Sequence, residues 1–466
     1  MTVDFRLAIR NLLRNRRRSL ATLLALVIGT TSILFFGGYR KNIEYSMITA
    51  YARDGGHLQV QHRDLFNYGA GDPTRYSIAD YGKILQAIAA DPVLSELVTV
   101  ATPTLQLGGI ASNSSGGVSR TVLGFGTVAA DRNRMRDWNE FQLPMLAERF
   151  ALDGAAPDAA VIGVGVARVL LLCDALKIPD CPPRVMAEES TGDALPDDIA
   201  KLAAASGPGL AGASPTGPPR LDLLASSAGG APNVVSLSLV KAERQGFKEL
   251  DEIYLLMQLP HAQLLVYGKA PPKATALMVQ LHSTADLTVA AERLRAVVAI
   301  AAPQQPLDVL DFQQINPFFV QTVQMFDTIF GFIFLLIGAI VLFTVGNTMS
   351  TAVMERTVEI GTIRALGVRR DGIRRLFVIE GMLLGVAGAV AGVVVALTGA
   401  ALVNSLGLTW MPPGSGARLP LLLVVWGETP TIVGTMLGLI AIAGASAWWP
   451  AFRASRLVIV DALRHA

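Results

Sequence analysis

Four long stretches without a charged residue constrain the fold of this chain more than any other feature. They cover residues 19–39, 328–354, 381–417 and 429–452. A helix of about 20 apolar residues crosses the roughly 30 Å hydrocarbon core of a bilayer. Charged residues make up only 16% of the chain, whereas ordinary soluble domains contain about 25%. The sequence therefore predicts a membrane protein with four transmembrane helices and excludes an ordinary soluble enzyme.

The third stretch is longer than one transmembrane helix needs. A Met-Pro-Pro-Gly run at 411–414 is typical of a turn. We therefore expect the third transmembrane helix at residues 381–405 and a loop outside the bilayer at 406–428. The other three helices are predicted at the bounds of their uncharged stretches, and an even number of helices places both termini on one side.

Arginines flank the predicted helices on one side of the membrane. They are Arg6, Arg10, Arg14, Arg16, Arg17 and Arg18, then Arg356, Arg364, Arg369, Arg370, Arg374 and Arg375, and finally Arg453, Arg456 and Arg464. Short segments rich in Lys and Arg face the cytoplasm. Residues 1–18, 355–380 and 453–466 are therefore predicted to be cytoplasmic, and residues 40–326 to face the periplasm. This favours a multi-pass protein of the bacterial inner membrane.

The N-terminal 18 residues show a helical pattern. Phe5, Ala8 and Leu12 recur on one face while arginines occupy the other, which predicts an amphipathic helix at the cytoplasmic interface. The arginines could instead act only as topology signals. A cleaved signal peptide is disfavoured, because the apolar run at 19–39 is long and no A-x-A-like site follows it.

The large segment at 40–326 mixes strand and helix patterns. Strand-like runs occur at 57–61, 97–107, 118–125, 275–281 and 307–312, and helical ones at 77–90 and 287–300. We expect a large α+β periplasmic domain, inserted between the first and second transmembrane helices. One α/β layer would come from both ends of this domain, with residues 139–240 as a second lobe. Ala, Gly, Pro and Ser dominate residues 201–233, which are predicted to form a flexible loop.

The chain contains two cysteines, Cys173 and Cys181, within the predicted periplasmic domain. A disulfide between them suits an oxidising compartment. The alternative is one buried thiol and one incidental one. No histidine or paired carboxylates stand at ligand spacing around them, so no metal site is predicted.

The sequence lacks motifs for several kinds of chemistry. It has no P-loop, no G-x-S-x-G and no H-E-x-x-H run, so the chain is not predicted to be an enzyme or to hold a cofactor. A formal charge of +2 gives no reason to expect nucleic-acid binding. The predicted spans carry no charge at mid-membrane depth, where an ion-coupled carrier would need one. Energy must then come from a partner.

Small residues mark the helix faces that pack closely. Glycines recur every three or four positions on the third and fourth helices, at Gly381, Gly385, Gly388, Gly392, Gly434 and Gly438. This spacing favours close helix packing, although glycine is also common in membrane helices generally. Glu380 and Glu428 lie at helix ends and are interpreted as capping or snorkelling carboxylates, with a role in helix coupling as the alternative.

The predicted cytoplasmic segment at 355–380 places apolar residues among charges. Val358, Ile360, Ile363 and Leu366 alternate there with acidic and basic residues. Exposed apolar side chains in such a segment indicate a protein partner. A helix lying on the lipid surface is the alternative.

The same segment reads Glu-Arg-Thr-Val-Glu-Ile-Gly-Thr-Ile-Arg-Ala-Leu-Gly at 355–367, with Glu-Gly at 380–381. This pattern resembles the signature of FtsX-like permeases, the membrane subunits of MacB-type (type VII) ABC systems. Pro-Ala-Phe-Arg-Ala-Ser at 450–455 is similar to the C-terminal ending of that family. Short runs at 56–60, 161–163 and 246–251 look most similar to lipoprotein-releasing permeases of the LolC and LolE kind.

The resemblance implies a mechanism and partners. A cytoplasmic ATPase dimer would bind ATP and Mg, and this chain would pair with a second permease chain, identical or paralogous. A periplasmic adaptor or lipoprotein carrier and membrane lipids would be further partners. The ATPase-docking residues implied are Glu355, Arg356, Glu359, Ile360, Gly361, Arg364 and Gly367.

Two functional hypotheses follow from the resemblance. In the first, ATP-driven motion extrudes lipoproteins or other amphipathic cargo by mechanotransmission. In the second, the same motion makes the chain a signalling scaffold that activates a periplasmic partner such as a cell-wall hydrolase. A sensor and detoxifier of peptide antibiotics is a third hypothesis. The size of the external domain favours the first.

Overall fold

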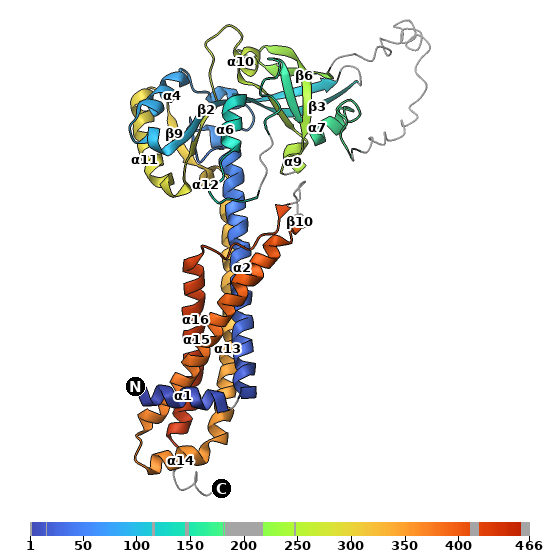
Figure 1. Ribbon diagram of the computed structural model, residues 1–466. Helices are drawn as coiled ribbons and strands as arrows, with labels where there is room; N and C mark the ends of the chain where they lie inside the picture. Colours follow the sequence, from blue (N-terminus) through green and yellow to red (C-terminus); the bar gives the residue numbers. More distant parts are fainter. Residues whose placement is uncertain are drawn as a thin grey trace. The chain divides into compact units, whose positions relative to one another are not determined.

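The computed structural model describes residues 2–14, 16–113, 117–144, 149–179, 181, 218–246, 248–410 and 419–457 (Figure 1). The chain divides into two compact units. We call one the helical unit, comprising Met1–Ser46, Phe318–Trp410 and Pro420–Ala466. The other is the β-rich unit, comprising Met47–Pro317 and Met411–Leu419.

Long apolar helices build the helical unit. Its helices are α1 (Thr2–Arg14), α2 (Arg16–Asp54), α13 (Pro317–Glu355), α14 (Thr357–Ala365), α15 (Arg370–Ser405) and α16 (Thr429–Ser455). Four of them, α2, α13, α15 and α16, are long and apolar enough to cross a membrane, as the uncharged stretches predicted. Two short strands, β10 (Thr409–Trp410) and β11 (Leu419–Pro420), lie in the predicted loop at 406–428.

The helices α2 and α13 run well beyond the uncharged stretches that predicted them. Each has 39 residues, whereas about 20 suffice to span a bilayer. The last residues of α2, from Met47 to Asp54, already belong to the β-rich unit. The predicted boundary at residue 39 marks the end of the uncharged run and not the end of the helix.

Glycines on α15 allow close packing against two different helices. A Cβ atom on Gly381 would lie 2.6 Å from the Cβ of Ala447 on α16, and one on Gly388 would lie 2.4 Å from the Cβ of Leu26 on α2. Gly385 also faces α16, and Gly392 faces Thr30 of α2.

The two glycines predicted to pack on α16 differ from each other. Gly438 faces the Phe334 ring of α13, at 2.6 Å from a Cβ built on the glycine. Gly434 has no atom of the described residues within 4 Å of such a Cβ. Within this chain the Gly434 side of α16 is therefore open, and its close packing against another helix stays a prediction.

Nine strands form the sheet of the β-rich unit. They are β1 (Leu58–His62), β2 (Val98–Asn113), β3 (Val118–Thr127), β4 (Ala159–Gly163), β5 (Arg220–Ser226), β6 (Pro232–Glu243), β7 (Tyr254–Gln258), β8 (Ala276–Leu281) and β9 (Leu307–Asp311). The main helices of this unit are α4 (Tyr81–Ala90), α6 (Ala129–Arg136), α7 (Val164–Val169), α10 (Leu259–Tyr267) and α11 (Leu287–Ala301). Shorter helices are α3 (Leu65–Tyr68), α5 (Leu94–Leu97), α9 (Lys248–Asp251), α12 (Phe312–Ile315), η1 (Pro73–Tyr76) and η2 (Thr284–Asp286).

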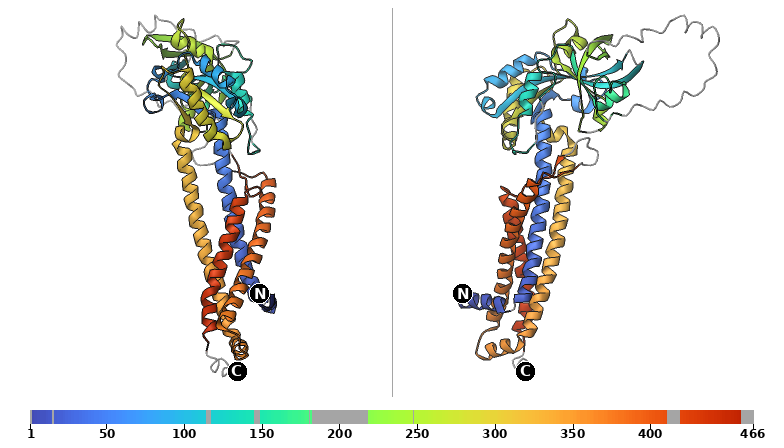
Figure 2. Two further views of the ribbon diagram at one scale, coloured as in Figure 1. Left: turned by 90° about the vertical axis from the view of Figure 1, so that its left-hand side faces the viewer. Right: turned by 45° about the vertical axis from the view of Figure 1, so that its right-hand side comes forward.

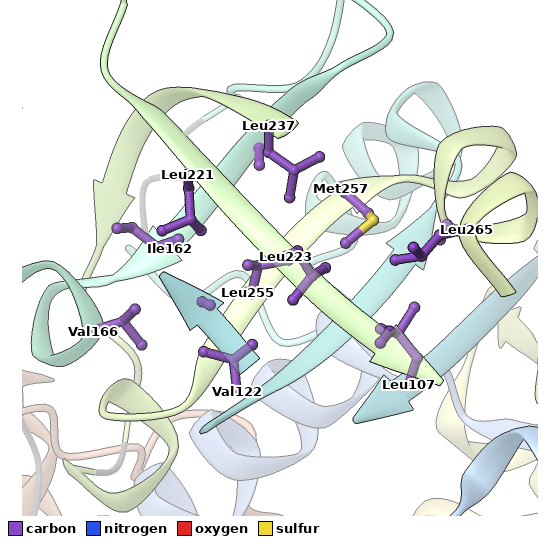
Figure 3. Packing of buried hydrophobic residues seen from close by; sticks show 14 of the residues in the cluster. Leu107, Val122, Ile162, Val166, Leu221, Leu223, Leu237, Leu255, Met257 and Leu265 are labelled. Atoms are coloured by element: carbon purple, nitrogen blue, oxygen red, sulfur yellow. The ribbon is translucent and has the colours of Figure 1, made fainter. Parts of the chain in front are cut away.

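Six of these strands close into a small barrel. Their hydrogen-bonded order is β3-β7-β4-β6-β5-β2, and β2 pairs with β3 to complete the ring. Alternate residues such as Leu107, Val122, Ile162, Leu223 and Met257 form one buried cluster (Figure 3). Side chains fill the interior of a barrel of this size, so the lobe is a packed core and not a channel.

The other strands form an α/β layer that shares β2 with the barrel. The first part of β2 pairs with β8, and β1 lies between β8 and β9. Blue and yellow segments, from the two ends of this part of the chain, lie together in the ribbon (Figure 2). Helices α4 and α11 contribute Ile84, Ile88 and Leu294 to the core beneath these strands. This agrees with the prediction of one layer assembled from both ends of the domain.

The predicted boundaries of the second lobe are wrong. The lobe was expected at residues 139–240, but the barrel also takes β2 and β3 before that range and β7 after it. The physical reason is the length of β2. This strand has 16 residues and serves both sheets, so no change of pattern along the sequence marks the boundary.

The predicted flexible loop at 201–233 is also wrong for its second part. Residues 220–226 form β5, whose Leu221, Leu223 and Ala225 are buried in the barrel. Three alternating apolar residues suffice for a strand whose other face is exposed. Residues 201–217 lie outside the described residues.

Cys173 and Cys181 are joined in a disulfide, with their Cα atoms 6.0 Å apart.

Candidate coupling site on the helical unit

Residues 355–380, which we call the coupling segment, include the short helix α14 and the glycine turn that follows it. Helix α14 ends at Ala365, and the amides of Leu366 and Gly367 donate to carbonyls of the last helical turn at 3.0 Å. Gly367 has φ +99°, a conformation that favours glycine at the end of a helix. Gly367 thus occupies the turn that leaves the helix.

A buried charge cluster fixes the start of this segment. The Arg356 guanidinium donates to the Glu380 carboxylate at 3.1 Å, and the Asn11 amide donates to the same carboxylate at 2.6 Å. Arg356 also donates to the Asn11 carbonyl oxygen at 3.1 Å. The side chains of Arg356 and Glu380 are only 9% and 2% exposed. Removing one partner of such a pair leaves an uncompensated buried charge, so the cluster holds α1, α14 and α15 together.

Two further ion pairs join the N-terminal helices to the same segment. Arg14 on α1 pairs with Glu359 on α14, and Arg18 on α2 pairs with Glu355 at the end of α13. Arg14 and Glu359 are 60% and 48% exposed. Exposed ion pairs contribute at most about 1 kcal/mol, so these pairs orient the segment more than they stabilise it.

The C-terminal end of α16 contacts the segment from another side. Arg364 donates to the Leu457 carbonyl oxygen. On α15, the Arg374 Nε atom donates to Ser455 Oγ at 3.1 Å, and its guanidinium lies 4.8 Å from the Phe452 ring centroid. Both ends of the helical unit therefore contribute contacts to the segment.

The apolar residues of the segment divide into two groups. Ile360, Ile373 and Phe377 are buried in the core of the helical unit. Val358, Leu366 and Val368 are exposed, with Leu366 at 81%. The exposed surface is therefore smaller than the sequence suggested, because helix periodicity turns part of the pattern inward.

The seven residues predicted for docking occupy different environments. Arg356, Ile360 and Gly361 are buried, Glu355, Glu359 and Gly367 are exposed, and Arg364 is half-buried. Sequence reasoning missed Asn11 and interpreted Glu380 as a capping or snorkelling residue. The preferred interpretation of Glu380 is wrong, since it is buried against Arg356. Glu380 lies inside α15 and not at its end, and the only signal in the sequence was a carboxylate directly before a long apolar run.

Glu428, the other carboxylate predicted at a helix end, has a different partner. The Tyr45 hydroxyl donates to Glu428 at 2.5 Å, linking α2 to the residue just before α16. Among the described residues, no three His, Cys, Asp or Glu side chains gather so as to hold a metal ion.

Comparison with known proteins finds a family match for part of the helical unit. Residues 328–459, which include α14, α15 and α16, match the family "FtsX-like permease C-terminal". The chain carries an FtsX-like permease domain. This domain contains the coupling segment, the α15 glycines and the Arg356–Glu380 pair described above.

Several curated proteins are similar to part of this chain. The macrolide export ATP-binding/permease protein MacB of Sodalis glossinidius is 36% identical over 142 residues, which are 30% of this chain and 19% of that protein. MacB of Escherichia coli K12 is 32% identical over 143 residues, 31% of this chain and 20% of its own. The ABC transporter permease YtrF of Bacillus subtilis is 40% identical over 76 residues, 16% of this chain and 17% of its own. The chain thus spans about a fifth of the length of these relatives.

Proposed function

We propose that this chain is the membrane permease subunit of an ABC transporter and transmits the energy of a separate ATPase subunit to the β-rich unit. The coupling segment carries the proposal, because it is a rigidly held helix with an exposed apolar and charged side. The similarity to MacB, a macrolide export ATP-binding/permease protein, and to YtrF, an ABC transporter permease, supports it. ATP and Mg would be bound by the ATPase, since this chain has no P-loop.

The docking surface in this proposal is the exposed side of the coupling segment. Glu359, Val358 and Leu366 would contact the ATPase, with Arg364 at the edge of the contact. Arg356, Ile360 and Gly361 would position the helix from within and touch no partner, since they are buried. An apolar side chain ringed by charges suits a protein contact better than a lipid surface.

The proposed orientation places the coupling segment in the cytoplasm and the β-rich unit in the periplasm of a bacterial inner membrane. The arginine-rich flanks support it. Each permease chain would work beside a second one, identical or paralogous. The cargo class we propose is lipoproteins or other amphipathic molecules, received by a periplasmic adaptor or carrier.

Reconstitution with the ATPase tests this function. The permease alone should hydrolyse no ATP and conduct no ions. The complex should hydrolyse ATP, and spin labels at exposed Ser226 of the barrel in the two permease chains should change their separation when ATP is trapped. An unchanged distance distribution would defeat transmission.

A second experiment separates transport from signalling. Depletion of the protein in cells should leave lipoproteins or other amphipathic cargo misplaced. If the labels move but cargo placement is normal, the chain acts as a scaffold that switches a periplasmic partner. Assay of cell-wall hydrolase activity in the depleted cells then tests that role directly.

A further inference from the structure

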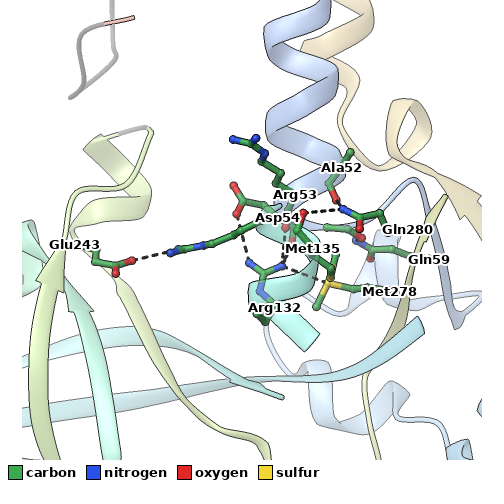
Figure 4. A network of polar contacts seen from close by, with 11 residues as sticks. Ala52, Arg53, Asp54, Gln59, Arg132, Met135, Glu243, Met278 and Gln280 are labelled. Atoms are coloured by element: carbon green, nitrogen blue, oxygen red, sulfur yellow. Dashed lines mark hydrogen bonds and ion pairs between the residues drawn. The ribbon is translucent and has the colours of Figure 1, made fainter. Parts of the chain in front are cut away.

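The C-terminal end of α2 is capped by side chains from two different elements of the β-rich unit (Figure 4). The last carbonyl groups of a helix have no partner within the helix itself. Here Gln280 Nε2 on β8 donates to the Ala52 carbonyl oxygen at 2.9 Å. Arg132 on α6 donates to the carbonyl oxygens of Arg53 (3.3 Å) and Asp54. The end of α2 is therefore bound through its backbone.

These caps are buried. The Arg132 side chain is 7% exposed, and Gln280 is fully buried. The same Gln280 amide also donates to the Met135 carbonyl oxygen on α6 at 2.9 Å. A rotation of α2 against α6 or β8 would break buried hydrogen bonds without offering water in exchange, which is unfavourable.

The chain leaves α2 without a flexible linker. Gly56 has φ +77°, and a Cβ atom there would lie 2.8 Å from the Val279 carbonyl oxygen on β8. His57 follows, and β1 begins at Leu58. Within the β-rich unit, α2 therefore passes directly into the α/β layer.

Helix α6 connects the same point to the barrel. It follows β3 after a single residue, and its Ala129 packs in a buried cluster with Phe150. Its Arg136 pairs with Glu243 on β6 at 3.4 Å, and the Arg136 guanidinium lies 4.4 Å from the Phe150 ring centroid. Helix α6 thus binds the α2 terminus through Arg132 and the barrel through Arg136.

We propose that α6 carries motion of α2 into the barrel, with Arg132 and Arg136 as positioning residues. The inference rests on the proposed function, since it assumes that α2 moves when the ATPase works. The α/β layer receives the same motion through β1 and the Gln280 cap, independently of Arg136. The barrel also shares β2 with the layer, so Arg136 adds a direct connection from the α2 terminus to the barrel through α6.

Labels on the two lobes distinguish these connections. Spin labels are placed at Ser226 on β5 of the barrel or at Thr288 on α11 of the layer, both exposed, in both permease chains of the reconstituted complex. Distances are measured with and without trapped ATP in the wild type, Arg132→Ala, Arg136→Ala and Glu243→Gln. Arg134→Ala is the matched control, because Arg134 lies on the same helix and its ion pair is with Asp131 of α6.

The expected result is a smaller ATP-dependent shift at Ser226 in Arg136→Ala and Glu243→Gln, with the shift at Thr288 and the ATP hydrolysis rate retained. Arg134→Ala should match the wild type. A wild-type shift at Ser226 in both Arg136→Ala and Glu243→Gln overturns the proposal. If Arg132→Ala lowers the melting temperature, its label distances are not used, and the proposal is tested by Arg136→Ala and Glu243→Gln. Absence of any shift in the wild type counts against the proposed function instead.

Discussion

The coupling segment and the end of α2 both rely on arginines, but the arginines bind different kinds of partner. At the coupling segment, Arg14 and Arg18 bind carboxylate side chains in partly exposed pairs. At the end of α2, Arg132 binds backbone carbonyl groups and is buried. Exposed ion pairs are weak and can be exchanged for pairs with another protein. A buried backbone cap has no such alternative, so one region suits exchange with a partner and the other suits rigid attachment.

The coupling segment combines both kinds of contact in layers. Beneath its exposed pairs lies the buried Arg356–Glu380 pair, which resembles the α2 cap in burial but joins two side chains. The exposed ion pairs can therefore rearrange while the buried Arg356–Glu380 pair keeps α14 in place. Four predictions test this comparison, from the largest expected effect on stability to the smallest.

Arg356→Ala should destabilise the helical unit by about 3–5 kcal/mol, because it leaves the buried Glu380 carboxylate without its cation. Arg18→Ala is the control and should cost at most about 1 kcal/mol, since Glu355 is half exposed. Thermal unfolding of the detergent-solubilised protein measures both. Equal melting temperatures for the two variants would show that the buried Arg356–Glu380 pair stabilises the helical unit no more than the partly exposed Arg18–Glu355 pair.

Stability of the β-rich unit should fall at acid pH through His57. Burial lowers the pKa of His57 to about 4, and its Nδ1 atom accepts the Leu281 amide proton at 3.1 Å, which requires the neutral ring. The unfolded chain has the ordinary value of about 6.5. The stabilisation is therefore complete above pH 6.5 and is lost as pH falls toward 4, by about 3 kcal/mol in total.

Hydrogen exchange of β8, corrected for the intrinsic pH dependence of exchange, measures this loss. His57→Gln should remove the pH-dependent part, whereas His282→Gln, at an exposed position, should retain it. If the wild type and His57→Gln show the same slope between pH 6.5 and 4, another group controls the acid stability next to the α2 terminus.

Gly388→Ala tests whether α2 is held as firmly within the helical unit as at its C-terminal end. The new methyl group would lie 2.4 Å from the Leu26 Cβ atom, and overpacking of this kind costs about 1–3 kcal/mol. Gly434→Ala is the matched control, since its side of α16 is open. Its expected effect is a gain of up to about 1 kcal/mol from helix propensity. Thermal unfolding with equal destabilisation by both variants would argue against close α2–α15 packing.

Glu359→Arg should change stability by less than about 1 kcal/mol, because its pair with Arg14 is exposed. Its effect on ATPase binding should be larger, since losing a close interfacial charge contact typically costs a few kcal/mol. Co-purification with the ATPase and ATP hydrolysis by the complex measure this effect.

The double variant Arg14→Glu with Glu359→Arg separates the two roles of Glu359. It restores an ion pair between positions 14 and 359 with the two charges exchanged. ATPase binding that stays weak in the double variant supports direct docking. Full recovery would mean that Glu359 acts only by positioning α14.

The sequence alone determined the elements whose information is local. Uncharged stretches predicted all four long helices, because a bilayer demands about 20 consecutive apolar residues. Strand and helix periodicity located β1, β2, β3, β8, β9, α4 and α11. The coupling segment was found from the order of its residues, and the glycine spacing on α15 indicated a packing face.

Contacts between distant parts of the chain were decided only by the tertiary structure. The barrel closes by pairing strands that are far apart in sequence, and β5 belongs to it although its surroundings are rich in Ala, Gly, Pro and Ser. Arg356 and Glu380 are 24 positions apart, and Arg132 lies 78 positions from Asp54. Periodicity reports which face of an element is apolar, but it carries no information about which element covers that face or which polar group meets a buried charge. Those choices depend on how all the elements pack at once, and so the caps and charge clusters appear only in three dimensions.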